Sequence, residues 1–238
     1  MRIDTIKTVE EIKEEHVYDR TVIVIDVLRA SSTIVTALET CFASVIPVRS
    51  AKEALALRSS NTIIAGEWHG KQLDGFDYNN SPTALKKERH IGKDLVLTTT
   101  NGTKAIEKAS KAHRLLIGCF LNAAACINDA LTQSRDITLY CAGTRNEFSL
   151  EDGLAAGLMV YLAKKQVPTI ETCDFSVAME ACYLQLENQL SPLLFSTTTG
   201  KRLVKNHNTE DIVYCGQTNI VKIVPIFKGN RILSLSYT

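Results

Sequence analysis

The sequence lacks the features that would direct a protein to a membrane or to nucleic acid. No apolar run approaches the ~20 residues that a membrane-spanning helix needs. Neither sign of charge is in excess, since 27 Lys and Arg face 26 Asp and Glu, and no basic cluster of the kind that follows a phosphate backbone occurs. The N-terminus, MRIDTIKTVEEIKEEH, is charged and alternating, unlike a signal or transit peptide. We therefore expect a cytoplasmic protein with neither a membrane nor a nucleic acid as partner.

The cysteines and histidines lack the spacings of disulfide frameworks and metal sites. The seven cysteines are odd in number and widely spaced, and no CxxC occurs. Cys141 lies inside the apolar run ITLYCAG, which favours reduced, buried thiols in a reducing compartment. The five histidines show no HxH or HExxH spacing, so we do not expect a zinc site.

The sequence does contain short apolar runs that alternate with amphipathic segments. Most of these runs show no period-2 alternation, which is typical of strands buried on both faces of a parallel sheet. The predicted strands are residues 22–27, 44–48, 62–67, 95–100, 115–120 and 137–143. Apolar stripes at helical spacing lie between them: Ile34, Leu38 and Phe42; Ala123, Ile127 and Leu131; and Leu150, Leu154, Leu158 and Leu162. The pattern predicts an α/β fold with three α/β/α layers and a largely parallel sheet.

The last third of the chain changes character. We predict a helix over 176–190, then a polar stretch over 196–209, then strands at 211–215, 222–227 and 231–236. A tight turn joins the last two strands into a C-terminal β-hairpin. With 238 residues and no low-complexity linker, we expect a single domain over residues 1–238. Two related halves that face a shared cleft, with a soft boundary near 115–135, are an alternative arrangement.

Unusual polar residues gather where predicted strands run into helices, the edge at which open α/β sheets bind ligands. In the first such turn, IDVLRASSTIV, Asp26 closes a strand and Arg29 follows it. The carboxylate suits a metal or a nucleophilic water, and the guanidinium offers a fork for phosphate or sulfonate. Ser31, Ser32 and Thr33 open the helix and would complete an anion pocket. An Asp26–Arg29 ion pair with hydroxyls that only cap the helix is an equal alternative.

The second turn, LVLTTTNGTKAI, is rich in threonine. It supplies hydroxyl donors, and a positive φ at Gly102 would let consecutive N–H groups converge on an anion. Three threonines at the end of a buried strand exceed what capping requires, so we favour anion binding over a polar turn with Thr103 as N-cap. The predicted binding residues are Thr99, Thr100, Asn101, Gly102 and Thr103.

The third turn follows Glu67 and carries acids and amides. The acids and amides of its loop would suit Mg²⁺, which prefers oxygen ligands; they are Asp74, Asp77, Asn79 and Asn80. A solvated loop is the alternative. Ser81 as N-cap, with Pro82 at the first helical position, is a good helix start.

The fourth turn, CAGTRNEFSLEDGLAAG, places Glu151 and Asp152 at a helix start. Ser149 and Asp152 have the spacing of a capping box, which gives Asp152 a structural explanation that Glu151 lacks. Two acids that complement the helix dipole are the alternative to a metal-binding pair.

The sequence lacks the usual motifs of phosphate chemistry. No GxxxxGK[ST] occurs, Asp26-Val27-Leu28 lacks the second Asp of a DxD aspartyl-phosphate site, and no Cys precedes an Arg by six positions. A mechanism based on a metal and on positioning remains.

These turns, in this order, resemble the motifs of the 2-phosphosulfolactate phosphatase family. The matching segments are IDVLRASSTIVTAL, AGE…GFDYNNSP, LVLTTTNGT, GCFLNA, CAG…FSLEDGLAAG, and GKRLVKNHNTEDIVYC followed by IVPIF. They span nearly the whole chain. The resemblance implies Mg²⁺-dependent hydrolysis of (2R)-phospho-3-sulfolactate to 3-sulfolactate and phosphate, in coenzyme M or sulfolactate biosynthesis. The implied partner is a small phosphorylated substrate with sulfonate and carboxylate groups.

The resemblance and the polar turns together define the candidate site. We expect catalytic roles for Asp26, Arg29, Glu67 and Glu151, and metal binding by Asp26, Glu67, Asp77, Glu151 and Asp152. Whether Asp26 is instead a covalent nucleophile stays open. Substrate-binding residues are predicted to be Ser31, Ser32, Asn80, Ser81, Thr99, Thr100, Asn101, Gly102, Thr103 and Asn122.

Two positions depart from the family pattern. Trp68 stands where the family often has Arg, and Asn79-Asn80 stands where a Gly-Asn pair is usual. If the missing Arg meets an anion, this protein acts on another phosphorylated acid, unless Lys71 or Arg145 replaces it. A non-catalytic small-anion binding protein on the same fold is the alternative from another functional class. A homodimer is the default expectation for the oligomeric state.

Overall fold

The computed structural model describes residues 1–68 and 70–235. His69, in the third polar turn, and Ser236, the last residue of the final predicted strand, lie outside the described residues. Within those two ranges, no helix is both long and apolar enough to cross a bilayer.

Eleven strands of the described chain form one sheet in the order β5-β4-β6-β3-β11-β10-β7-β2-β8-β1-β9. They are β1 (Arg2–Ile6), β2 (Thr21–Ile25), β3 (Ser44–Pro47), β4 (Thr62–Trp68), β5 (Lys71–Gln72), β6 (Asp94–Thr98), β7 (Arg114–Gly118), β8 (Ile137–Cys141), β9 (Glu171–Thr172), β10 (Val224–Lys228) and β11 (Arg231–Leu235). The predicted strands between 22 and 143 correspond to β2, β3, β4, β6, β7 and β8 and are confirmed.

The sheet consists of two parallel groups joined by an antiparallel hairpin. Strands β4, β6 and β3 form one group, and β7, β2, β8, β1 and β9 form the other. The predicted C-terminal hairpin, β10–β11, is confirmed and lies between them, pairing with β7 on one side and β3 on the other. The boundary near 115–135 does not separate the two groups, because β2 precedes it and pairs with β7 and β8.

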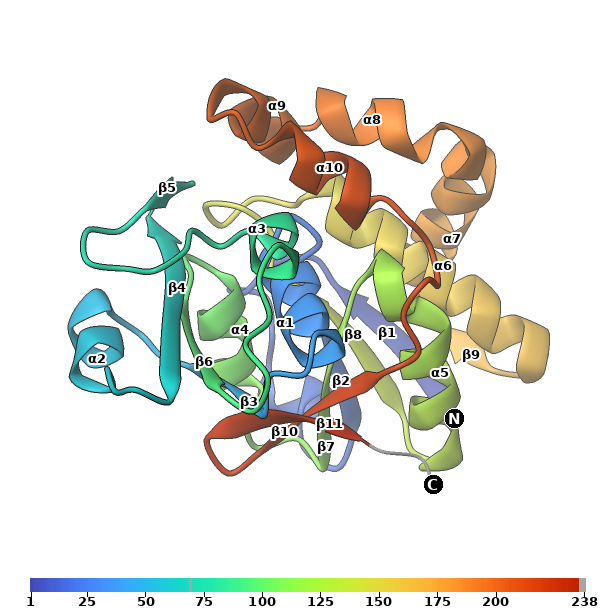
Figure 1. Cartoon of the computed structure of the whole chain (residues 1–238). Helices are drawn as coiled ribbons and strands as arrows, with labels where there is room; N and C mark the ends of the chain where they lie inside the picture. Colours follow the sequence, from blue (N-terminus) through green and yellow to red (C-terminus); the bar gives the residue numbers. More distant parts are fainter. Residues whose placement is uncertain (69, 236–238) are drawn as a thin grey trace.

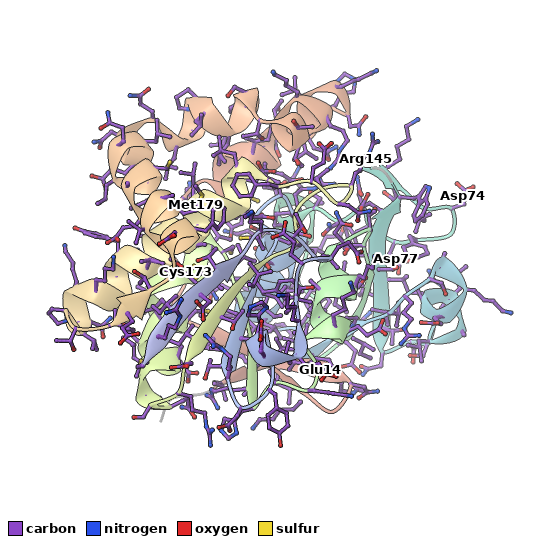
Figure 2. The ribbon with its side chains drawn as sticks, turned by 180° about the vertical axis from the view of Figure 1, so that it is seen from behind. Glu14, Asp74, Asp77, Arg145, Cys173 and Met179 are labelled. Carbon is purple, nitrogen blue, oxygen red and sulfur yellow. The ribbon has the colours of Figure 1, made fainter. Side chains whose placement is uncertain are left out.

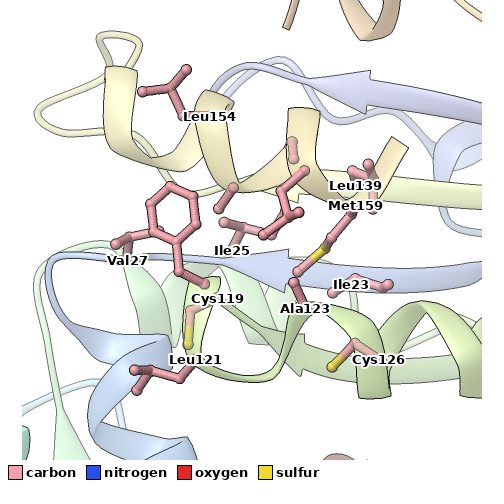
Figure 3. Close-up of a cluster of buried hydrophobic side chains, with 14 of the residues drawn as sticks. Ile23, Ile25, Val27, Cys119, Leu121, Ala123, Cys126, Leu139, Leu154 and Met159 are labelled. Atoms are coloured by element: carbon pink, nitrogen blue, oxygen red, sulfur yellow. The ribbon is translucent and has the colours of Figure 1, made fainter. Parts of the chain in front are cut away.

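Helices cover both faces of the sheet, which confirms the three-layer α/β/α prediction (Figure 1). They are α1 (Ala30–Glu39), α2 (Ala51–Ala56), α3 (Pro82–Lys86), α4 (Gly102–Lys108), α5 (Ala123–Thr132), α6 (Leu150–Gln166), α7 (Asp174–Leu186), α8 (Leu190–Ser196), α9 (Thr198–Lys205) and α10 (Thr209–Cys215). Along β2, Val22 and Val24 pack into a cluster with α1 and α4. Ile23 and Ile25 face the opposite side and pack with α5 and α6, in the cluster shown in Figure 3.

Two sequence predictions fail at the ends of the chain. Residues 211–215 form the helix α10 and not a strand, so that prediction is wrong. A short apolar run does not distinguish the two by itself, and Glu210 and Asp211 in the first turn complement a helix dipole. The strand β1 was missed because its exposed residues are charged, although Ile3 and Thr5 are buried.

Three C-terminal helices lie over the strand ends that lead into the polar turns (Figure 1). We call α8, α9 and α10 the cap. The predicted helix over 176–190 corresponds to α7 and the turn that leads to the cap, while the polar stretch 196–209 contains α9. Asn206, just after α9, donates a hydrogen bond from Nδ2 to the backbone oxygen of Gly70, between β4 and β5, at 3.4 Å. The cap thereby contacts the β4–β5 turn, at the strand ends that carry the polar turns.

Candidate active site

A pocket lies beneath the cap at the carboxyl ends of β2, β4, β6 and β8. Side chains or backbone from all four predicted turns line it, together with the cap helix α9. The lining residues are Asp26, Leu28, Arg29, Glu67, Gly70, Asn80, Thr99, Thr100, Asn101, Gly143, Thr144, Arg145, Arg202 and Leu203.

Asp26 lies directly after β2, where the chain enters α1. Its Oδ1 accepts a hydrogen bond from the Ala30 N–H at 3.2 Å. Burial first, and then the negative charges of Glu67 and Glu151, raise the pKa of Asp26 to about 7, against the Ala30 hydrogen bond and the positive charge of Arg202. A carboxyl group with a pKa near neutrality, in a polar pocket, is typical of a functional group.

The serines after Asp26 do not line the pocket. The Ser31 Oγ accepts the Asp26 N–H at 3.0 Å and donates to the Val24 carbonyl at 3.2 Å, and the Ser32 Oγ donates to the Val27 carbonyl at 2.8 Å. Both hydroxyls are buried and hold the β2–α1 turn. The pocket lining does not support their predicted contact with substrate, which stays a prediction.

Arg29 is bound to a residue that the sequence reading missed. Its Nη1 donates to Asp211 Oδ2 on α10 at 2.5 Å, and both side chains are buried. Asp211 Oδ1 accepts hydrogen bonds from Ser81 Oγ at 2.9 Å and from the Thr83 hydroxyl at 2.6 Å. Within residues 1–68 and 70–235, Asp26 and Arg29 form no ion pair, because Arg29 binds Asp211 of the cap instead. The predicted N-cap role of Ser81 is confirmed, since its Oγ accepts the Ala84 N–H at 3.2 Å.

Glu67 is held by the threonine-rich turn. Its Oε1 accepts hydrogen bonds from the Thr100 N–H at 3.0 Å and the Thr100 hydroxyl at 2.9 Å, and its Oε2 accepts the Gly70 N–H at 2.5 Å. Three donors on one carboxylate fix its orientation in the pocket.

The same turn does not form the open backbone nest that its composition suggested. The Thr99 Oγ1 accepts the Thr103 N–H at 3.1 Å, and the Thr103 hydroxyl donates back to the Thr99 carbonyl at 3.0 Å. Asn101, and not Thr103, stands at the N-cap position of α4, and its Nδ2 donates to the Gly143 carbonyl at 2.9 Å. Thr99, Thr100 and Asn101 nevertheless line the pocket.

Gly102 is required for close packing and not for a positive φ. It is the first residue of α4, and its φ is not positive. A Cβ at this position would lie 2.3 Å from the Ala30 Cβ and 2.9 Å from Asp26 Oδ2. Only glycine therefore lets the starts of α1 and α4 meet beside the Asp26 carboxylate.

Asp152 joins two of the turns from behind the pocket. Its Oδ1 accepts the Val27 N–H at 2.8 Å and its Oδ2 accepts the Gly143 N–H at 3.0 Å. Burial first, and then the charges of Asp26 and Glu151, raise the pKa of Asp152 well above its usual value. The predicted capping box is wrong, because the Ser149 side chain makes no capping hydrogen bond.

Glu151 is buried, and no hydrogen bond or ion pair to another described residue accounts for its burial. Its side chain is buried and makes no side-chain hydrogen bond or ion pair within residues 1–68 and 70–235. It does not line the pocket, yet its charge contributes to the raised pKa of Asp26. It therefore adds negative charge at the site without contacting a positive partner in the part of the chain that the structure describes.

Three predicted residues differ in how they relate to the pocket. Asp77 lies outside it, because its carboxylate is bound to Arg58 at 3.1 Å and to the Ile64 N–H at 2.8 Å, on the flank beside β4 that Figure 2 shows. Asn122 is buried elsewhere, where its Oδ1 accepts the Cys119 N–H at 3.0 Å. Asn80 lines the pocket, and its buried Oδ1 has no hydrogen-bond partner among the described residues.

The oxygen ligands in the pocket fit a hard divalent cation. Proteins usually hold Mg²⁺ through one or two carboxylates, and waters and substrate phosphate oxygens complete the shell. Asp26 and Glu67 both line the pocket, and their like charges raise the pKa of Asp26. Among the residues that the structure describes, no group of three or more His, Cys, Asp or Glu side chains has the arrangement of a metal site. A cation shared between two carboxylates and a phosphate would not require such a group.

Comparisons with known proteins agree with the pattern of the turns. The sequence model of a family described as 2-phosphosulpholactate phosphatase matches residues 6–230. A protein of Thermotoga petrophila named probable 2-phosphosulfolactate phosphatase is 40% identical over 206 residues, which cover 87% of this chain and 88% of the relative. Relatives with the same name from Clostridium acetobutylicum and Caldanaerobacter subterraneus are 34% and 35% identical, and the matches cover 98% and 96% of this chain and 100% and 96% of those proteins.

Proposed function

The chain belongs to the 2-phosphosulpholactate phosphatase family, and we propose that it hydrolyses 2-phosphosulfolactate to 3-sulfolactate and inorganic phosphate with the help of Mg²⁺. The (2R) substrate and a place in coenzyme M or sulfolactate biosynthesis belong to the same proposal. The observation that carries it is the set of acids around Asp26, whose pKa is raised to about 7 by burial and by Glu67 and Glu151. A protein that only bound an anion would gain nothing from two carboxylates that line the pocket and a third whose charge reaches it, since each repels the ligand.

Asp26 and Glu67 are the residues that would hold Mg²⁺, because both present carboxylate oxygens to the pocket. Bound there, the ion would neutralise phosphate charge and lower the pKa of a coordinated water. The hydrogen bonds from Thr100 and Gly70 keep Glu67 in place for this role. Asp26 has a pKa suited to accepting a proton from the attacking water near neutral pH.

Arg29 would bind and orient the phosphate from the wall that faces the cap. Its Nη1 is bound to Asp211, and the remaining guanidinium N–H groups are available to phosphate oxygens in the pocket it lines. The buried ion pair fixes the guanidinium before substrate arrives, so little rotational freedom is lost when the phosphate binds. Charge that develops on the phosphoryl oxygens would then meet a donor that is already oriented.

The proposal is tested by measuring phosphate release from 2-phosphosulfolactate, with and without EDTA. We expect release that EDTA abolishes and Mg²⁺ restores. The matched variants are Asp26→Asn, which should abolish release, and Asp74→Asn, an exposed loop acid outside the pocket, which should not. Binding of 3-sulfolactate without any phosphate release would favour a non-catalytic anion-binding protein, and release only from other phosphorylated acids would reject this substrate.

A further inference from the structure

Arg202 is a cationic side chain of the pocket that has no hydrogen-bond or ion-pair partner among the described residues. It lies on the cap helix α9, is half-buried and lines the pocket. Its Nε is buried and has no hydrogen-bond partner among the described residues, and the guanidinium makes no ion pair with any of them. A buried guanidinium nitrogen without an acceptor is costly, so its place beside a polar pocket points to an acceptor that arrives with the ligand.

The other two arginines of the pocket are placed differently. Arg29 is already bound to the buried Asp211. Arg145 lies in an exposed turn with a φ of 54°, beside the cap in Figure 2. Arg202 combines partial burial with an uncompensated charge, and that charge reaches the site, because it opposes the rise in the pKa of Asp26.

The helix that carries Arg202 contacts the β4–β5 turn, whose Gly70 N–H binds the Glu67 carboxylate. The Asn206 Nδ2 donates to the Gly70 carbonyl at 3.4 Å, and Asn79 donates to the same oxygen at 3.4 Å. Gly70 has a φ of 82°, and a Cβ there would lie 2.8 Å from Asn206 Nδ2 and 3.7 Å from Arg202 Nε. The β4–β5 turn and α9 therefore meet at close range, and Arg202 has a defined position in the wall opposite the strand ends.

The charge of the substrate requires cations on more than one wall. With its phosphate, carboxylate and sulfonate, 2-phosphosulfolactate carries about four negative charges at neutral pH. The phosphate has to lie against Asp26 and Glu67, where a cation and the attacking water would be. The three-carbon skeleton then places the other anionic groups elsewhere in the pocket, where Arg202 is a lining cation.

We propose that Arg202 binds the sulfonate of the substrate and determines the preference of the enzyme for a sulfonated phosphoester. This inference rests on the proposed function. The planar guanidinium can donate two parallel hydrogen bonds to sulfonate oxygens, and its partial burial strengthens them. Arg202 is thus a specificity-determining residue, supplied by a segment far from the strand ends in sequence.

The test compares two substrates that differ only in the sulfonate, 2-phosphosulfolactate and 2-phospholactate, in wild type and Arg202→Gln. We expect kcat/KM for 2-phosphosulfolactate to fall about 10- to 100-fold, the effect of a lost hydrogen bond to a charged group, while kcat/KM for 2-phospholactate changes less than about 3-fold. Lys201→Gln removes the same charge from an exposed position of the same helix and should leave both values unchanged. Arg202→Lys, which keeps the charge but not the fork, should fall between wild type and Arg202→Gln.

An equal loss for both substrates would overturn the inference, because Arg202 would then serve the phosphate or the carboxylate. A wild-type preference for 2-phosphosulfolactate that survives in Arg202→Gln would overturn it as well. If the wild type releases phosphate from neither substrate, the proposed function fails, and calorimetric binding of 3-sulfolactate against lactate then decides the inference alone. Tighter binding of 3-sulfolactate that is lost in Arg202→Gln but kept in Arg202→Lys supports it, and the lack of such a difference rejects it. Circular dichroism and thermal melts of each variant show whether a loss reflects unfolding.

Discussion

Replacing Asp26 by Asn is expected to abolish phosphate release and, in the absence of metal, to make the protein more stable at pH 8. Burial and the neighbouring acids raise the pKa of Asp26 to about 7 in the folded protein, against 3.8 for an ordinary Asp. The folded state therefore binds this proton more tightly than the unfolded state does. Its contribution to the free energy of unfolding is fully present below about pH 4 and is lost as the pH rises through 7.

The expected size follows from the two pKa values. A difference of about 3 pKa units, at about 1.4 kcal/mol each, corresponds to about 4 kcal/mol of unfolding free energy lost between about pH 4 and pH 8. Asn cannot ionise, so the variant lacks this loss. Asp152, whose pKa is also raised, leaves some pH dependence in both proteins. The quantity to compare is therefore the difference between wild type and Asp26→Asn.

Urea unfolding in EDTA, at pH 5, 6, 7 and 8, measures this difference. We expect the wild type to lose stability relative to Asp26→Asn as the pH rises, while the exposed-site control Asp74→Asn follows the wild type. Mg²⁺ should stabilise the wild type at pH 8 by mass action and should stabilise Asp26→Asn much less. Parallel pH curves for wild type and Asp26→Asn would refute the reasoning, because Asp26 would then carry no unfavourable charge.

Three further substitutions test separate parts of the site. Asp211→Asn removes the buried partner of Arg29 and should lower the free energy of unfolding by about 3–5 kcal/mol in urea melts; an unchanged midpoint would contradict the role of this ion pair. Gly102→Ala places a Cβ 2.3 Å from the first residue of α1 and should cost about 1–3 kcal/mol and reduce kcat, so wild-type values in both assays would show that the helices can separate freely. Glu151→Gln removes a charge that raises the pKa of Asp26, so the acid limb of the pH profile of kcat/KM should move to lower pH, and a limb that stays in place would exclude Asp26 as the titrating group.

The central sheet could be predicted from the sequence because its strands are buried on both faces. Runs such as 22–27 and 115–120 are apolar without period-2 alternation, which is typical of strands that are buried on both faces of a parallel sheet. Elements that are decided by distant contacts could not be predicted in the same way. The segment DIVYC has a strand-like composition but forms part of the cap helix α10. Its Asp211 is bound to Arg29, a residue far away in sequence. The position of the β10–β11 hairpin in the middle of the sheet likewise depends on β3 and β7, far away in sequence.

The candidate site could be predicted where strand ends converge. Glu67 and Thr99 lie at the carboxyl ends of β4 and β6, which are parallel neighbours and therefore share an edge. Asp26 follows β2 in the other parallel group and lines the same pocket, which depends on how the two groups pack together. The pocket does not support the predicted substrate contacts of Ser32 and Asn122. Hydroxyl and amide groups near a strand end can equally well form hydrogen bonds with the backbone around them. Sequence spacing does not distinguish these two uses.

Unsatisfied polar atoms separate the two uses where spacing does not. In the described residues, five buried side-chain atoms have no hydrogen-bond partner, and those of Asn80 and Arg202 belong to residues that line the pocket. Leaving a buried polar group unpaired costs about 1–3 kcal/mol. Ser32 and Asn122 incur no such cost, because the protein itself supplies their partners. A ligand that offers acceptors to Arg202 would recover its share of this cost on binding, and a sulfonated substrate offers sulfonate oxygens that a simple phosphoester lacks.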